Sequence, residues 1–166
     1  MSIVFYEIKI MLEELENKKK ITKNKIIVGK LSNEIIDFLN KNNTPIYTKE
    51  IYLTSKGLSH LARDSKKRRG AGLKREDILR IGEILGNISA VFFEKTKQKF
   101  NLLYCDNNSK RCIKIVVDTK GYTNRKEKIT LIKTAGYINF DDMKNPDFEL
   151  IFGVWNKEQG RTVTSP

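Results

Sequence analysis

The spacing of apolar residues changes from helical to strand-like about half-way along the chain. Before residue 89, apolar side chains recur three and four positions apart, which is typical of helices that bury one face. From Ser89 onward they alternate with polar side chains in short runs, which is typical of strands. Helices followed by a contiguous set of strands indicate an α+β fold.

Four segments of the first half carry the helical pattern. They are residues 3–17, a helix capped by Ser32 that stops before Pro45, a helix capped by Thr54 or Ser55 that runs to Arg69, and a helix that ends at Gly86 and Asn87. Short extended segments at 26–28 and 46–53 lie between the first three.

Four segments of the second half carry the alternating pattern of strands: 89–95, 99–105, 111–118 and 126–134. Because short polar turns join them, we expect an antiparallel meander. A fifth short strand is expected at 148–152. The predicted fold is therefore α+β, with N-terminal helices packed on a four-stranded or five-stranded antiparallel sheet.

The same pattern divides the chain into three parts. Residues 1–25 form an amphipathic helix with a basic linker, residues 26–152 form the main domain, and residues 153–166 form a flexible tail. The first helix could pack on the domain or pair with a second copy, so oligomerisation through it stays open.

Charge is the strongest signal in the composition. The 166 residues carry a net charge of +12 and a pI near 9.7, much of it in the runs 18–25, 66–75 and 120–128. An excess of this size suggests a polyanionic partner such as RNA or DNA. No apolar run approaches the ~20 residues of a membrane span, and the N-terminus lacks the features of a signal peptide. We therefore expect a cytoplasmic protein with no membrane partner.

Two cysteines, Cys105 and Cys112, bracket a turn, where a disulfide would fit. The missing secretion signal favours the reduced pair instead. One histidine and two cysteines match no metal-ligand spacing, so no metal and no cofactor are expected.

The helix predicted from Thr54 carries the only histidine, His60. At about 100° per residue, Lys56, His60, Arg63 and Lys67 share one stripe of this helix, and Leu58 and Leu61 lie opposite. Cations around one imidazole can hold a phosphodiester and move a proton. The plainer interpretation is a solvated basic helix, which charge runs usually form.

Metal-independent cleavage of RNA fits the available residues better than other hydrolytic chemistry. No G-x-S-x-G motif is present, and the carboxylates of Asp106, Asp118, Asp141 and Asp142 are scattered. In RNA the 2′-hydroxyl is itself the nucleophile, so a proton shuttle and cations suffice. We expect His60, Lys56 and Arg63 to act together with sheet residues. Those residues are Lys114, Thr134 and Tyr137. Nucleic-acid contacts are expected from Lys66, Lys67, Arg68, Arg69, Lys74, Arg75, Thr130 and Lys133.

Four stretches resemble a known nuclease family: GKLSNEIIDFLNKNN, EIYLTSKGLSHLARDSK, LKREDILRIGEILGN and ITLIKTAGYI. Their order is similar to that of phage and polymorphic-toxin nuclease domains of the barnase–EndoU–colicin–RelE-like (BECR) fold, over residues 29 to 140. The resemblance implies that His60 is the helix histidine and Thr134 the hydroxyl of the last strand. It also implies a basic strand residue, either Lys114 or Lys133. Lys133 has core-facing parity unless a bulge turns it.

The resemblance implies a phage-encoded or toxin-type endoribonuclease acting on RNA, including tRNA, in a bacterial host cell. A toxic nuclease would need an acidic immunity protein or antitoxin. Many relatives carry a second histidine a few residues after the first, where this chain has Asp64 and Lys66. A non-catalytic nucleic-acid-binding or phage structural module on the same fold is therefore the alternative. A regulator of a nucleoprotein complex is a third.

Overall fold

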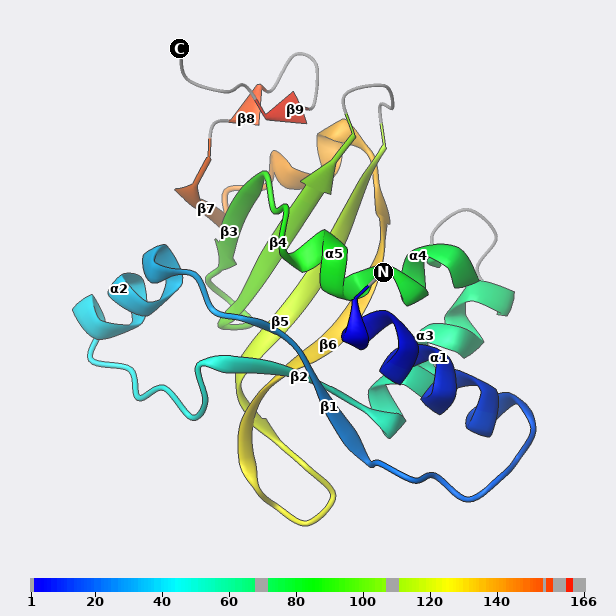
Figure 1. The fold of residues 1–166 in the computed structure, drawn as a ribbon. Helices are drawn as coiled ribbons and strands as arrows, with labels where there is room; N and C mark the ends of the chain where they lie inside the picture. Colours follow the sequence, from blue (N-terminus) through cyan, green and yellow to red (C-terminus); the bar gives the residue numbers. More distant parts are fainter. Residues whose placement is uncertain (1, 68–71, 107–110, 154, 157–160, 163–166) are drawn as a thin grey trace.

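A computed structural model describes residues 2–67, 72–106, 111–153, 155–156 and 161–162 (Figure 1). Its helices are α1 (Ile3–Glu16), α2 (Asn33–Lys41), α3 (Ser55–Lys67), α4 (Arg75–Leu79), α5 (Ile81–Leu85) and the 3-10 helix η1 (Phe140–Met143). Its strands are β1 (Lys25–Lys30), β2 (Glu50–Thr54), β3 (Ala90–Glu94), β4 (Lys99–Cys105), β5 (Cys112–Tyr122), β6 (Lys128–Ile138), β7 (Phe148–Phe152), β8 (Trp155–Asn156) and β9 (Arg161–Thr162). Among the described helices, none has the length and apolar character that crossing a membrane would require.

The α+β class is confirmed, but the sheet is larger than predicted and is mixed. Its seven strands lie in the order β1-β2-β6-β5-β4-β3-β7. The antiparallel meander from β3 to β6 is present as predicted. The prediction of a purely antiparallel sheet of four or five strands is wrong, because the antiparallel pair β1 and β2, which are connected through α2, adds to one edge. There β2 runs parallel to β6 at Ile51 and Tyr52.

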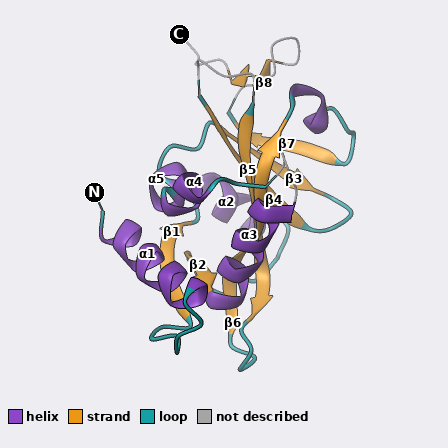
Figure 2. Cartoon of the chain, turned by 90° about the vertical axis from the view of Figure 1, so that its right-hand side faces the viewer, coloured by secondary structure: helices purple, strands orange, loops and turns teal. Residues whose placement is uncertain are grey.

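The helices and most of the core lie on one side of this sheet. Figure 2 shows α1, α4 and α5 to one side of the strands, with η1 on the opposite side. Alternate residues of β5, namely Ile113, Ile115 and Val117, belong to the main core on the helix side. A smaller core on the other side includes Phe92, Cys112 and Met143. Both faces of the sheet are thus partly covered, and the helix side is covered more deeply.

The fourth predicted helix is two short helices, α4 and α5. The chain leaves helical geometry at Arg80, which ends α4 and precedes α5. Gly82 of α5 comes close to α1: a Cβ added there would lie 2.7 Å from the Val4 Cγ1 atom. A glycine at this position lets α1 and α5 approach closely.

The amphipathic helix predicted over residues 3–17 is present as α1, and its apolar stripe packs on the same chain. Ile8, Met11 and Leu12 are at most 2% exposed and belong to the main core. Another row of α1, made of Ile3, Tyr6 and Ile10, remains exposed. Self-association through this row stays a prediction.

Ile8→Ala should lower the free energy of unfolding by about 2–5 kcal/mol, because it leaves a cavity in the main core. Ile10→Ala is the matched control, two residues along the same helix and 56% exposed, and should cost less than about 0.5 kcal/mol. Urea titration of both variants checks this. Equal losses would show that α1 does not contribute its buried stripe to stability.

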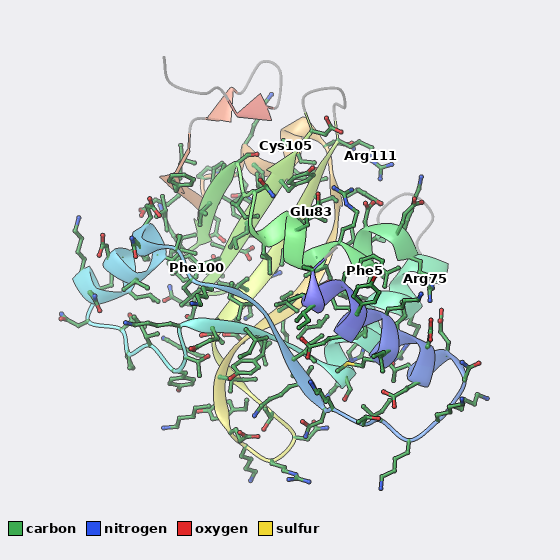
Figure 3. All side chains as sticks on the ribbon, viewed as in Figure 1. Phe5, Arg75, Glu83, Phe100, Cys105 and Arg111 are labelled. Carbon is green, nitrogen blue, oxygen red and sulfur yellow. A yellow bond between two sulfur atoms is a disulfide. The ribbon has the colours of Figure 1, made fainter. Side chains whose placement is uncertain are left out.

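The two cysteines form a disulfide across the β4–β5 hairpin. Cys105 and Cys112 are directly opposite each other in the ladder, with their Cα atoms 4.5 Å apart. The expectation of a reduced pair differs from the structure, because hairpin register brings the two side chains to one face of the sheet. Figure 3 shows Cys105 and Arg111 at the same end of the sheet.

Candidate functional site

The beginning of α3 is fixed tightly against the sheet. The Thr54 hydroxyl caps the helix by accepting a hydrogen bond of 3.0 Å from the Gly57 backbone N–H. A Cβ added at Gly57 would lie 3.6 Å from the Ile132 carbonyl oxygen of β6, so the helix lies close to that strand. Leu58 and Leu61 are buried, whereas Lys56 and His60 are exposed. The two faces predicted for this helix are confirmed for these four residues, and the side chain of Lys67, the last member of the predicted stripe, lies outside the described part.

A bulge in β6 turns Lys133 out of the sheet. Val117 pairs with Ile132 and Val116 pairs with Thr134, so Lys133 has no partner in β5. Its side chain is exposed. Ile132 and Ala135, three positions apart, both belong to the main core, so the strand carries one extra residue between them. The bulge lies beside α3 and therefore places a lysine next to the histidine helix.

These features enclose a cleft of about 390 Å³, which we call the α3 cleft. It lies between the start of α3, the bulge of β6 and the loop from β5 to β6. Figure 1 shows this loop at the lower end of the sheet. Its lining residues are Asn24, Thr54, Ser55, Lys56, Gly57, His60, Tyr122, Thr123, Asn124, Arg125, Leu131, Ile132 and Lys133. They include one imidazole and three cations, and no carboxylate whose side chain the structure describes.

The two lysines of the α3 cleft differ from several other cations of this protein in their partners. Within the described residues, Lys56 and Lys133 form no salt bridge, unlike several other cations of this protein. Lys25, for comparison, is bound to Glu127 at 2.7 Å, and Lys25 lowers the pKa of that carboxyl group, chiefly by a hydrogen bond. A cleft with uncompensated cations attracts anions.

The structure brings together only some of the residues predicted to be catalytic. Lys56 and His60 line the α3 cleft, and Arg63 is exposed on α3 but is not among the lining residues. Lys114 and Thr134 pair with Gly136 and Val116. They alternate with residues of the helix-side core and therefore lie on the other face of the sheet. The sheet separates these two side chains from His60.

The predicted nucleic-acid contacts are also divided. Lys133 lines the α3 cleft, Lys74 lines a second cleft, and Arg75 pairs with Glu16 of α1 at 3.2 Å. Lys66 and Lys67 lie in α3, where their side chains are not described, and Arg68 and Arg69 lie outside the described residues.

Thr130, another predicted contact, is instead fully buried. Its hydroxyl donates to the Thr48 carbonyl oxygen at 2.6 Å, and its backbone N–H donates to the Thr48 hydroxyl. These bonds join β6 to the segment before β2, so the Thr130 hydroxyl is used within the fold.

Tyr137 lies in the second cleft, of about 310 Å³, between α4 and the β4–β5 hairpin. Its hydroxyl donates to Asp77 and accepts the Lys74 backbone N–H. The Arg111 guanidinium lies 4.5 Å from its ring centroid. Burial raises the pKa of Tyr137, and the hydrogen bond to Asp77 raises it further. The hydroxyl therefore stays protonated and fixes α4 to β6.

Tyr137→Phe should lower the free energy of unfolding by about 1–3 kcal/mol, because the Asp77 carboxylate loses a donor in a partly buried place. Tyr122→Phe is the control, since within the described residues the Tyr122 hydroxyl meets the Tyr47 hydroxyl at the surface, and it should stay within about 0.5 kcal/mol of the wild type. Thermal denaturation followed by circular dichroism compares the two. An unchanged midpoint for Tyr137→Phe would contradict this role.

Sequence reasoning missed the part of the α3 cleft that comes from the β5–β6 loop. Arg125 lines the cleft with Tyr122 and Thr123, about 65 residues after His60 in the chain. The only signal for it in the sequence was the cationic run at 120–128. That run predicts a positively charged segment but not which part of the fold it lies beside.

In the described part of the chain, no three His, Cys, Asp or Glu side chains are grouped so that they could hold a metal ion. No protein-family model, curated protein or solved structure matches this chain significantly.

Proposed function

We propose that this protein is a metal-independent endoribonuclease that cleaves RNA by attack of the 2′-hydroxyl, in the manner of a phage-encoded or toxin-type nuclease. The observation that supports the proposal best is the lining of the α3 cleft. It combines one imidazole with three cations, and none of its described side chains is a carboxylate. Such a cleft suits the binding of a polyanion whose cleavage requires the transfer of a proton.

His60 would move the proton in this reaction. Its neutral imidazole takes the proton of the 2′-hydroxyl while the 2′-oxygen forms a bond to phosphorus. The bond from phosphorus to the 5′-oxygen then breaks, and the 5′-oxygen takes a proton from water or from a lysine ammonium group. The products are a 2′,3′-cyclic phosphate and a free 5′-hydroxyl.

The three cations would stabilise the charge that develops during this step. Lys56, Arg125 and Lys133 reach the same cleft from α3, the β5–β6 loop and the β6 bulge. Cations that are already in place around a phosphorane stabilise it without reorganisation. The N-terminal end of α3 adds a partial positive charge on the same side. The binding energy is thus directed at a phosphate group beside His60.

RNA and DNA oligonucleotides of one sequence test the proposal. The RNA should be cleaved and the DNA should remain intact, because DNA lacks the 2′-hydroxyl. Cleavage of both would contradict the mechanism. Binding of both without cleavage would assign the protein to the alternative class, a non-catalytic nucleic-acid-binding module.

The proposal also includes the cellular setting expected from the sequence. RNA cleavage would take place in the cytoplasm of a bacterial cell, with tRNA among the candidate targets. A cell that makes such an enzyme would need an inhibitor. An acidic protein that covers Lys56, Arg125 and Lys133 would suit the charge of the α3 cleft.

A further inference from the structure

A pair of tyrosines, one exposed and one half-buried, lies beside the α3 cleft. Tyr122 is the last residue of β5, is 54% exposed, and lines the cleft. Tyr47 comes from the segment between α2 and β2. The two ring centroids are 5.9 Å apart, with an angle of 65° between the planes, and the hydroxyl oxygens are 3.4 Å apart. We call these two residues the tyrosine pair.

Single exposed apolar side chains are common and need no explanation. The tyrosine pair differs because it combines two aromatic rings with a cation and adjoins a cationic cleft. Lys128 is the cross-strand partner of Tyr122, and its Nζ atom lies 5.5 Å from the centroid of the Tyr47 ring. Arg125, three residues after Tyr122, lines the adjoining cleft.

The carboxylates near the tyrosine pair are already engaged. Glu127 is bound to Lys25 at 2.7 Å, and Asp118 accepts the Lys120 backbone N–H at 2.9 Å. Lys128 has no such ion pair within the described residues. Asp118 keeps its negative charge, whereas Lys25 neutralises Glu127. The positive charge available beside the rings comes from Lys128 and Arg125.

Aromatic rings beside cations are the arrangement with which proteins hold single-stranded nucleic acid: bases stack on the rings, and phosphates meet the cations. In a duplex the bases are paired and stacked on one another, so only an unpaired base can lie on a protein ring. The position of Tyr122 at the rim of the α3 cleft places such a base next to the phosphate held there.

We propose that the tyrosine pair is a stacking platform for an unpaired nucleobase, and that the substrate of the α3 cleft is single-stranded RNA or a loop. The inference rests on the proposed ribonuclease function and names its substrate class. Tyr122 supplies the exposed ring face, Tyr47 supports that ring from the side, and Lys128 meets the adjacent phosphate.

Binding of a fluorescent eight-nucleotide 2′-O-methyl RNA tests the platform, since a blocked 2′-oxygen cannot be cleaved. Tyr122→Ala should weaken single-strand binding roughly 5- to 150-fold and leave the weaker binding of the matching duplex unchanged. Tyr122→Phe keeps the ring and should bind as the wild type does. Tyr6→Ala is the matched control, because Tyr6 is 49% exposed but lies on α1, outside the α3 cleft.

The thermal midpoint of each variant shows that the fold is retained. Unchanged single-strand affinity of Tyr122→Ala overturns the platform, and so does an equal loss in Tyr6→Ala. A wild-type protein that binds no single strand overturns it as well. Cleavage of unmodified RNA is measured separately. Loss of affinity in Tyr122→Ala from a wild type that cleaves no RNA supports the platform and removes the nuclease proposal. Normal cleavage by the wild type together with unchanged affinity of Tyr122→Ala supports the nuclease proposal and removes the platform.

Discussion

His60→Ala lowers the rate of RNA cleavage by about 10²- to 10⁴-fold, the range typical for loss of a general base or acid. RNA affinity should remain nearly unchanged, because Lys56, Arg125 and Lys133 still line the cleft. The side chain is exposed, so its removal leaves no cavity and the fold should be retained. Single-turnover cleavage with a labelled oligoribonucleotide measures the effect on the chemical step.

Arg63→Ala is the matched control for this variant. Arg63 is exposed on the same helix, nearly one turn after His60, but is not among the residues that line the α3 cleft. Its replacement should reduce the rate far less than that of His60. If the two variants lose activity equally, the chemistry is not confined to this cleft.

Phe100→Ala should lower the free energy of unfolding by about 3–5 kcal/mol, a large share of the roughly 5–15 kcal/mol typical of a folded domain. Phe100 is fully buried in β4. Its ring centroid lies 5.0 Å from that of Phe93 and 5.8 Å from that of Phe38. Its loss therefore loosens α2 from the sheet.

Phe152→Ala serves as the control, because Phe152 lies on the edge strand β7 and is 39% exposed. It should cost clearly less than Phe100→Ala. Urea denaturation gives both values. A loss for Phe152→Ala as large as that for Phe100→Ala would contradict the assignment of the main core.

The local parts of this fold could be predicted from the sequence. The strands β3 to β6 follow one another through short turns, so alternation and turn residues were enough to find them and to pair them. The Thr54 cap and the buried leucines of α3 are equally local. The residues that determine each of these features lie within a few positions of one another in the chain.

The position of β2 could not be predicted in this way. β2 pairs with β6 about 80 residues later, at Ile51 with Thr130 and Tyr52 with Leu131. Nothing in the sequence of either strand indicates that it pairs with the other. The chain goes from β2 directly into α3, so this pairing is what brings the histidine helix to β6. The sequence could show the helix but not the strand beside it.

The composition of the site depended on a bulge. In simple alternation, Thr130 and Thr134 share a face, and Lys133 points the other way. The bulge at Lys133 puts Thr134 on the face away from the main core, while Thr130, opposite Ile51, remains buried. One extra residue in the ladder thus separates Thr134 from His60 and brings Lys133 to it. Alternation alone could not locate that residue.

Cleavage of RNA in the α3 cleft should require His60 and no metal ion. The most direct measurement incubates RNA with the wild type and with His60→Ala in excess EDTA and analyses the ends of the products. We expect the wild type to cleave in EDTA and to leave 2′,3′-cyclic phosphates, and His60→Ala to cleave about 10²- to 10⁴-fold more slowly. Wild-type cleavage that EDTA abolishes, or equal cleavage by both proteins, would contradict this expectation.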